Sequence, residues 1–232
     1  MLYTFAFFCP PPQDIINHIQ QIQGFQGSLE VYGTEEIAVA VEGIGDVEGL
    51  QRTDQALLRA ALVHDQVIQG IFAHVPVLPV RFGTCFPTRE RLMAYVREQG
   101  AGLAEQLRRL GDRAEYVLKI QVVPPPSAEP TLPRTGTDYL LARRQQYLQQ
   151  QRFQDNLQVE SASLEGLWSQ EWEYHKLPPQ EQEWGRYVFL LTPEQAQRAQ
   201  GLTQAWQQQH PHWHFLWGPP LPPYHWTKLV AQ

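Results

Sequence analysis

Cysteine is almost absent from this sequence, since only Cys9 and Cys85 occur among 232 residues. Two thiols cannot build the disulfide framework of a small secreted domain, so the sequence favours a reducing, cytoplasmic setting. Runs of about 20 apolar residues are absent too, which argues against a membrane as a partner. The apolar start, "MLYTFAFFCPPP", lacks a basic region and a small-residue cleavage site, and we interpret it as a first strand rather than a signal peptide.

Basic residues are scarce as well: 18 Lys and Arg stand against 24 Asp and Glu, for a net charge of −6. Neutralising phosphates needs a basic face, so this balance argues against nucleic acid as a partner. The sequence does contain 43% hydrophobic residues, as expected of a globular chain that buries a core. Its length suits two modest domains better than one large domain.

The N-terminal half predicts the element order β-α-β-β-α-β. We expect strands at 2–8, 28–32, 36–42 and 75–82, and helices capped by Asp14 and Thr53. Further helices are expected at 88–97, with Thr88 as its cap, and at 102–109, followed by a strand at 114–123. The order of the first six elements is that of the split βαβ motif. We therefore predict an α+β protein whose first domain, residues 1–123, is a ferredoxin-like βαββαβ variant.

Five prolines occur in the thirteen residues 124–136, "PPPSAEPTLPRTG", which we interpret as a linker between domains. Residues 137–232 predict a small α+β domain with a long helix and an antiparallel sheet. Its strands are expected at 186–192 and 212–217, and a helix begins at Pro193. All seven tryptophans lie in this half. We expect most of them in the core, with a role as interface anchors as the alternative.

Two motifs of the first domain are candidates for enzymatic chemistry. Residues 42–49, "EGIGDVEG", place glycines between a strand and a helix, but the spacing is GxGxxxG and the carboxylates would repel a pyrophosphate. His64 and Cys85 are the residue types of a nucleophilic site, but no local signature supplies a base or an oxyanion hole. We predict no cofactor and no catalytic residue, and a structural role for Cys85.

A metal site is the third candidate. His210, His212 and His214 alternate in "HPHWHF", and on a strand all three would project from one face, where they could share a zinc ion. No cysteine or carboxylate is close in sequence to complete the ligands, and Pro211 interrupts the strand pattern next to His210. We predict no metal and keep these three histidines as the candidates if one binds. The alternative is a hydrated histidine face opposite an aromatic core face.

Glutamines are frequent between Gln145 and Gln158, among Arg143, Arg144 and Arg152. They lie on the predicted long helix of the second domain. This segment is either a partner-binding helix or a solvated helix face, and composition favours the solvated face.

Four segments together resemble the gas vesicle protein F/L family. "VHD" at 63–65 with "PVLPVRFGT" at 76–84 looks like its signature, and "GDRAEYVLK" at 111–119 is similar to its glutamate-bearing strand. "GTDYLLAR" at 136–143 resembles the start of its second domain, and "WGPPLPPYHW" at 217–226 resembles its C-terminal segment. In that last segment Leu221 and Trp226 stand where tryptophan and phenylalanine are usual. The residues that carry the resemblance are His64, Asp65, Pro76, Pro79, Arg81, Phe82, Gly83, Tyr139, Arg143, Gly218, Pro219, Pro222, Pro223 and Tyr224.

The resemblance implies a minor, non-enzymatic component of gas vesicles, which are protein-walled flotation organelles. Such a protein would take part in vesicle assembly in the cytoplasm, bind the small hydrophobic major shell protein, and have other minor gas vesicle proteins as further partners. It would have two α+β domains, the first a modified ferredoxin-like one. The alternatives are a ferredoxin-like regulatory protein that binds a small ligand, and a cysteine/histidine-based or metal-dependent enzyme.

The stretch "PVLPVRFGTCF" at 76–86 carries three structural expectations. Pro76 and Pro79 each lack a backbone N–H, so their strand is expected at a sheet edge. Arg81 is expected to pair with Asp65, and Gly83 to adopt a backbone conformation that other residues avoid.

Overall fold

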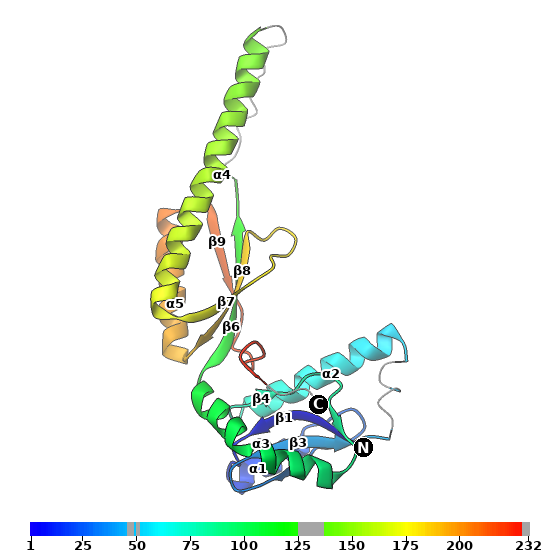
Figure 1. The fold of residues 1–232 in the computed structure, drawn as a ribbon. Helices are drawn as coiled ribbons and strands as arrows, with labels where there is room; N and C mark the ends of the chain where they lie inside the picture. The colour runs from blue at the N-terminus through cyan, green and yellow to red at the C-terminus, as the bar shows by residue number, and fades with distance from the viewer. Residues whose placement is uncertain (46–48, 50–51, 125–136, 229–232) are drawn as a thin grey trace. The chain divides into compact units, whose positions relative to one another are not determined.

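The computed structural model describes residues 1–45, 49, 52–124 and 137–228 (Figure 1). The chain forms two compact units, and the predicted α+β class is confirmed. Unit 1 contains Met1–Tyr116, Leu190–Glu194 and the segment that begins at Pro219, and unit 2 contains Val117–Phe189 and Gln195–Gly218. Across the described ranges, no helix combines the length and apolar character needed to cross a membrane.

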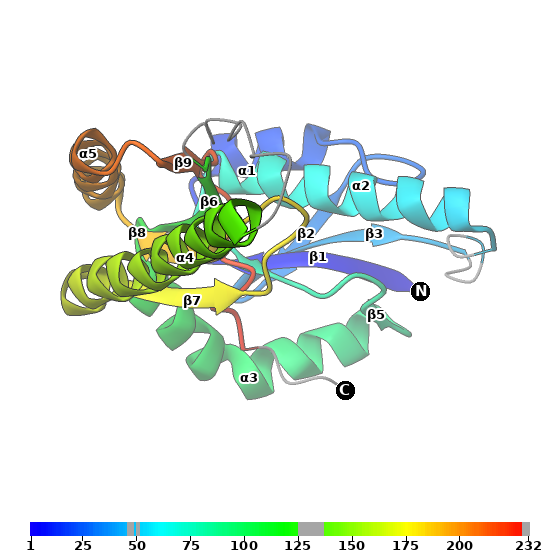
Figure 2. The same ribbon diagram turned by 90° about the horizontal axis from the view of Figure 1, so that it is seen from above.

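Unit 1 is built on an antiparallel sheet with the strand order β2-β3-β1-β4, and β5 pairs with the other end of β1. Its elements are β1 (Leu2–Phe8), α1 (Gln13–Gln21), β2 (Glu30–Gly33), β3 (Ala38–Gly43), α2 (Asp54–Phe72), β4 (Leu78–Pro79), β5 (Cys85–Phe86) and α3 (Arg89–Leu110). This is the strand order of the predicted ferredoxin-like fold. Figure 2 shows α1 and α2 on one face of the sheet and α3 on the other. Because helices cover both faces, β1 is buried almost throughout, and its sequence lacks the alternation of a half-exposed strand.

The helix caps of unit 1 follow the sequence in two of three cases. Thr53 Oγ1 accepts from the Ala56 N–H at 3.1 Å, and Thr88 caps α3 in the same way. Asp14 is not a cap, because α1 begins at Gln13 after Pro12, which places Asp14 inside the first turn.

The two helices predicted at 88–97 and 102–109 are one helix, α3. Gly100 and Gly102 do not break it, because buried side chains at helical spacing continue across them, namely Leu92, Tyr95, Val96, Leu103, Leu107 and Leu110. On α2 the buried face is Ala60, His64, Val67, Ile68 and Ile71. Leu57, Leu58 and Leu62 continue the apolar spacing of this helix, but they are 40%, 63% and 55% exposed.

The predicted strand at 75–82 shrinks to the two residues of β4, Leu78–Pro79. Pro76 and Pro79 provide no N–H to pair, and the chain turns at Arg81–Thr84, where the Thr84 N–H donates to the Arg81 carbonyl at 3.2 Å. The short β5 then pairs with the first residues of β1, Leu2 and Tyr3. β4 does lie at the edge of the sheet, as the two prolines predicted.

Unit 2 has a second antiparallel sheet with the order β7-β8-β6-β9. Its elements are β6 (Ala114–Val122), α4 (Thr137–Glu171), β7 (Glu173–Leu177), β8 (Gly185–Leu191), α5 (Pro193–Gln209) and β9 (Trp213–Trp217). The core is aromatic: the Trp168 ring from α4 meets Phe189 of β8 edge-on at 5.3 Å, and Trp217 of β9 lies on the same Phe189 at 5.3 Å. Four of the seven tryptophans in the chain are buried, as the core interpretation predicted.

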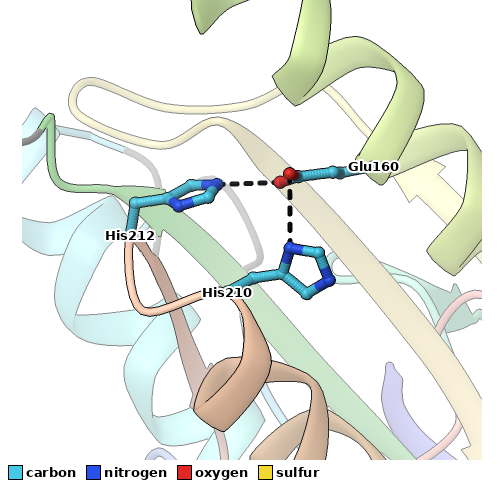
Figure 3. Close-up of side chains that lie close together, drawn as sticks. All are labelled: Glu160, His210 and His212. Carbon is cyan, nitrogen blue, oxygen red and sulfur yellow. Dashed lines mark hydrogen bonds and ion pairs between the residues drawn. The ribbon is translucent and has the colours of Figure 1, made fainter.

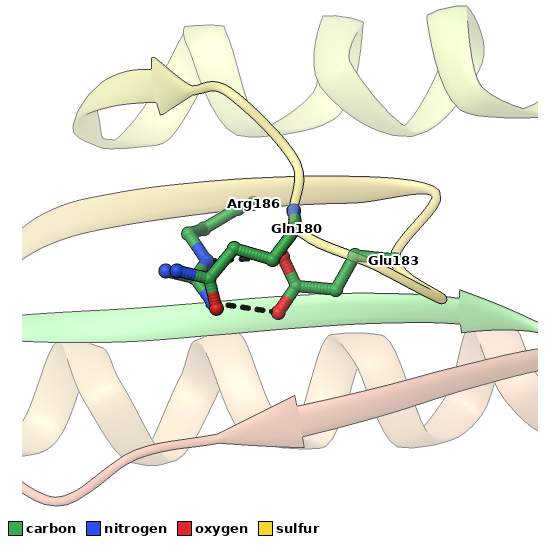
Figure 4. Close-up of polar contacts among 3 residues, drawn as sticks. All are labelled: Gln180, Glu183 and Arg186. Atoms are coloured by element: carbon green, nitrogen blue, oxygen red, sulfur yellow. Dashed lines mark hydrogen bonds and ion pairs between the residues drawn. The ribbon is translucent and has the colours of Figure 1, made fainter.

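The turn between β7 and β8 is closed by a polar cluster (Figure 4). The Arg186 guanidinium donates to both carboxylate oxygens of Glu183, at 2.8 and 3.0 Å, and also to the side chain of Gln180. The same carboxylate accepts from the Gln180 backbone N–H at 2.8 Å. Bidentate pairing of this kind fixes geometry, and here it holds the turn that aligns β7 with β8.

The compact units differ from the predicted ranges 1–123 and 137–232 in three places, the first of which is the short stretch Leu190–Glu194, which groups with unit 1. β6 runs past the end of unit 1 at Tyr116, and its second half pairs with β9 in unit 2. The segment from Pro219 returns to unit 1, where Leu221 exchanges two backbone hydrogen bonds with Glu115, at 2.8 and 2.9 Å. The prolines of this segment cannot continue a paired strand after β9, which explains why the chain leaves the second sheet there.

Candidate functional sites

The stretch at 76–86 takes part in a chain of hydrogen bonds around His64. The Gly83 N–H donates to the Tyr3 hydroxyl oxygen at 2.9 Å, and the Tyr3 hydroxyl lies 3.0 Å from His64 Nδ1. On the other side of the ring, His64 Nε2 lies 3.0 Å from the Val80 carbonyl oxygen. A carbonyl only accepts, so Nε2 carries the hydrogen and Nδ1 accepts from Tyr3. One neutral tautomer therefore satisfies every contact, and the loop after β4 is fixed to β1 and α2.

Gly83 meets the conformation expected of it, because its φ is +85°. A side chain at this angle would be strained. Phe82 lies beside it and packs edge-on against His64 at 5.6 Å. The motif residues of this loop are therefore explained by backbone conformation and packing.

Arg81 does not pair with Asp65, and that expectation was wrong. Its side chain is exposed, and Asp65 is occupied by Gln69 Nε2 at 2.6 Å and by the Tyr224 hydroxyl. Tyr224 comes from the C-terminal segment, which no local pattern places beside α2. Burial and the Asp65 hydrogen bond raise the pKa of Tyr224 well above its usual range.

The remaining family-motif residues occupy different settings. Pro76 is exposed and Pro79 buried, while Pro222 and Pro223 are buried in the C-terminal segment. Gly218 donates its N–H to the Val117 carbonyl at 2.8 Å, and Pro219 begins the return to unit 1. Tyr139 and Arg143 are exposed on the first turns of α4. None of these placements assembles a reactive site among the described residues.

A Cys/His nucleophile is not assembled either. Both ring nitrogens of His64 are engaged by Tyr3 and Val80, so neither is available as a base. Burial raises the pKa of the Cys85 thiol, which opposes the thiolate that nucleophilic chemistry needs. In the glycine-rich segment, residues 46–48 lie outside the described residues. Its first residue, Glu42, uses its carboxylate to hold the backbone of 25–27.

We expect the free energy of unfolding of unit 1 to decrease as the pH is lowered, because His64 is buried in its neutral form. Burial lowers its pKa below the ordinary value of 6.5, against the opposing effects of Val80 and Asp65. The unfolded state therefore binds a proton more readily, and the contribution of His64 is intact above about pH 6.5 and lost progressively below it. Urea unfolding of the parent and of His64→Gln should give curves whose difference in unfolding free energy shrinks from pH 7.5 to 5.5. A difference that stays constant over this range would contradict the assignment.

Two of the three predicted histidines meet a carboxylate in unit 2 (Figure 3). His210 Nδ1 lies 3.2 Å from Glu160 Oε1, and His212 Nε2 lies 2.8 Å from Glu160 Oε2. The Trp213 indole N–H also donates to Glu160 Oε2 at 2.6 Å. His214 lies outside this cluster, because β9 begins only at Trp213 and the predicted alternation does not extend back to His210.

Glu160 was missed because it lies about 50 residues before the histidines, on the long helix α4. Burial would raise the pKa of its carboxyl, but the hydrogen bonds from Trp213 and His212 hold that pKa below its usual range. The carboxylate is therefore charged at neutral pH and faces two imidazole rings. No sequence pattern pairs residues at this separation, so only the fold reveals the cluster.

The first half of α4 exposes several large apolar side chains. Four large side chains, which we call the α4 stripe, are 67%, 53%, 66% and 41% exposed: Leu140, Leu141, Tyr147 and Leu148. They repeat at a spacing of seven residues, so they share one side of the helix. Figure 1 shows this half of α4 extending beyond the strands of its own sheet. Within the described residues, the helix is buried against the sheet only from Leu157 onward, through Leu164 and Trp168.

Comparison with known families decides the identity of the fold. The family model described as "Gas vesicle synthesis protein GvpL/GvpF" matches residues 1–228. The chain belongs to this family. The match covers nearly the whole length, in agreement with the four segments whose resemblance the sequence showed.

Solved structures agree with the family at the level of the fold. The crystal structure of the gas vesicle protein GvpF from Anabaena sp. PCC7120 is 16% identical, with a TM-score of 0.63 over 99% of this chain and 97% of that chain. The structure of GvpF from Microcystis aeruginosa is 17% identical, with a TM-score of 0.64 over 98% of this chain and 99% of that chain. The comparison with curated proteins gives no match.

Proposed function

We propose that this member of the gas vesicle family assists vesicle assembly by binding the small hydrophobic major shell protein through the α4 stripe. The observation that carries the proposal is the exposure of four large apolar side chains on the part of α4 that precedes its contact with the rest of unit 2 at Phe153. In this proposal the protein has a non-enzymatic role and works in the cytoplasm and at the vesicle. Other minor gas vesicle proteins are its further partners.

The physical reason lies in the shell protein. A protein that lines a gas space exposes apolar surface, and before assembly this surface is prone to aggregation. A partner that presents a complementary apolar helix face can cover it until the subunit joins the wall. Helices that dock through an apolar face are recognised by anchors at spacings of three, four and seven residues, and the stripe supplies the seven-residue spacing twice, at 140/147 and 141/148.

Addition of a shell strand to a sheet edge is the other mode open to such a partner. The edges of the first sheet suit it poorly, since β4 has two residues, one of them Pro79, and β2 has four. The tryptophans also argue against an aromatic anchor surface, because four of the seven are already packed in the core. The α4 stripe is therefore the surface that we assign to the shell protein.

The test is a pull-down of purified shell protein on the immobilised full chain, at low and moderate salt. We expect retention at both, because contacts between apolar side chains are not screened by ions. Absence of retention at both salt concentrations would refute the partner. Hydrolysis of nucleotides or esters well above background would favour an enzyme instead, and a small ligand that raises the melting temperature would favour the regulatory alternative.

A further inference from the structure

We infer that Glu160, His210 and His212 form a binding site for a divalent transition-metal ion, with Zn²⁺ as the best match. The inference stands apart from shell binding, because it concerns the packed half of α4 and the chain around β9.

The ligand atoms already converge. One nitrogen from each histidine and a carboxylate oxygen of Glu160 all lie within 4.8 Å of one another. Around a tetrahedral zinc ion with bonds of about 2.0–2.1 Å, neighbouring ligand atoms are about 3.3 Å apart. His210 Nδ1 and His212 Nε2 approach different oxygens of the Glu160 carboxylate, at 3.2 and 2.8 Å, so both rings already face the same group. Small side-chain rotations would therefore place all three around one ion.

The rings are held in position by their surroundings. His210 stacks on Trp206 with ring centroids 4.6 Å apart, and His212 meets the Phe153 ring edge-on at 5.5 Å. The Trp213 N–H that donates to Glu160 is an outer partner of the type that orients metal-binding carboxylates. Such contacts reduce the cost of ordering the ligands when an ion binds.

Charge and access suit a dication with an open position. Two neutral imidazoles and one carboxylate give the site one negative charge, and imidazole with carboxylate is a ligand set that zinc accepts. The side chains of Glu160, His210 and His212 are 22%, 26% and 22% exposed, so water can reach the fourth position. Any hydrogen on a coordinating ring nitrogen would move to the other nitrogen of the same ring by exchange with water, so that both imidazoles stay neutral, and the ion would tie α4 to the segment between α5 and β9.

The experiment uses the full chain after removal of metal by chelation. Zn²⁺ is titrated in competition with a chromophoric chelator, and Co²⁺ is added separately to record its visible absorption, which reports tetrahedral coordination. We expect one equivalent to bind, and a rise in melting temperature with Zn²⁺. His212→Ala should weaken binding by at least roughly tenfold, since it removes a direct ligand.

The matched control is His214→Ala, because His214 lies two residues from His212 and outside the cluster. It should leave the affinity unchanged, as should Cys9→Ser, which removes an exposed thiol. Glu160→Gln keeps the size of the side chain and should weaken binding even if His212→Ala unfolds. Absence of a one-to-one complex, or equal loss in the His214→Ala control, would overturn the inference.

Discussion

Replacing Leu141 and Leu148 together by glutamine should weaken binding of the shell protein strongly while leaving the fold intact. The two side chains are 53% and 41% exposed, so their removal costs little packing in the free protein. Glutamine is a good helix former, and surface changes of this kind usually alter stability by less than about 0.5 kcal/mol. Covering the exposed half of each leucine at an interface is worth about 1 kcal/mol. The double change should therefore weaken binding by about 2 kcal/mol, or roughly thirtyfold.

A matched control separates the α4 stripe from a general loss of apolar surface. Leu58 and Leu62 on α2 are 63% and 55% exposed, so their double replacement by glutamine removes the same chemistry from unit 1. Titration of the fluorescently labelled chain with shell protein should give unchanged affinity for this control. Equal losses in the two double variants, or unchanged binding after the α4 change, would exclude the stripe as the docking surface. Failure of every variant and of the parent chain to bind would instead reject the partner.

Glu42→Ala should lower the free energy of unfolding by about 3 kcal/mol, since an unpaired backbone N–H costs about 1–3 kcal/mol. The Glu42 side chain is nearly fully buried, and its carboxylate accepts from the N–H groups of Phe25, Gln26 and Gly27, at 2.6, 2.6 and 2.8 Å. Alanine leaves all three donors without that acceptor. The loop also carries Phe25, whose ring meets Tyr3 at 4.7 Å, so its release would loosen the core.

Urea unfolding followed by circular dichroism provides the measurement. Glu36→Ala is the matched control, because Glu36 is an exposed carboxylate in the turn before β3 and should cost less than about 0.5 kcal/mol. Glu42→Gln keeps one acceptor oxygen and should lie between the parent and the alanine variant. A Glu42→Ala variant within about 1 kcal/mol of the parent would show that water replaces the carboxylate in holding the loop.

Elements with a clear apolar pattern were predictable from the sequence, whereas the strand that contains prolines and the strand without an apolar face were not. The long apolar faces of α2 and the run "RYVFLL" of β8 predict their structure directly. The prediction of a strand over 75–82 was wrong, because its two prolines lack the N–H groups that strand pairing needs, although its side chains are apolar. β7, "EYHKL", was missed because its half-exposed residues show no clear apolar face.

Among the candidate sites, residues close in sequence were predictable, whereas partners from distant segments were not. His210 and His212 were found because they are close in sequence, whereas Glu160 is brought to them only by the packing of α4 on the sheet. The expected Arg81–Asp65 pair relied on proximity in the chain. The fold instead brings Tyr224, 159 residues away, to the same carboxylate. Sequence patterns report local periodicity, while partners of buried polar groups are chosen by tertiary packing.

Because the C-terminal segment returns to unit 1, folding of unit 1 can be completed only late in synthesis of the chain. Glu115 is 2% exposed in the finished protein, where its carboxylate accepts from the N–H of His225 and lies 2.8 Å from that residue's Nδ1. These partners are separated by 110 residues. A ribosome adding about 5–20 residues per second leaves this carboxylate without its final partner for at least about 5 seconds. Unit 1 is therefore completed only after unit 2 has been made, and a nascent chain that stalls in unit 2 would present an unfinished first unit to the chaperones of the cell.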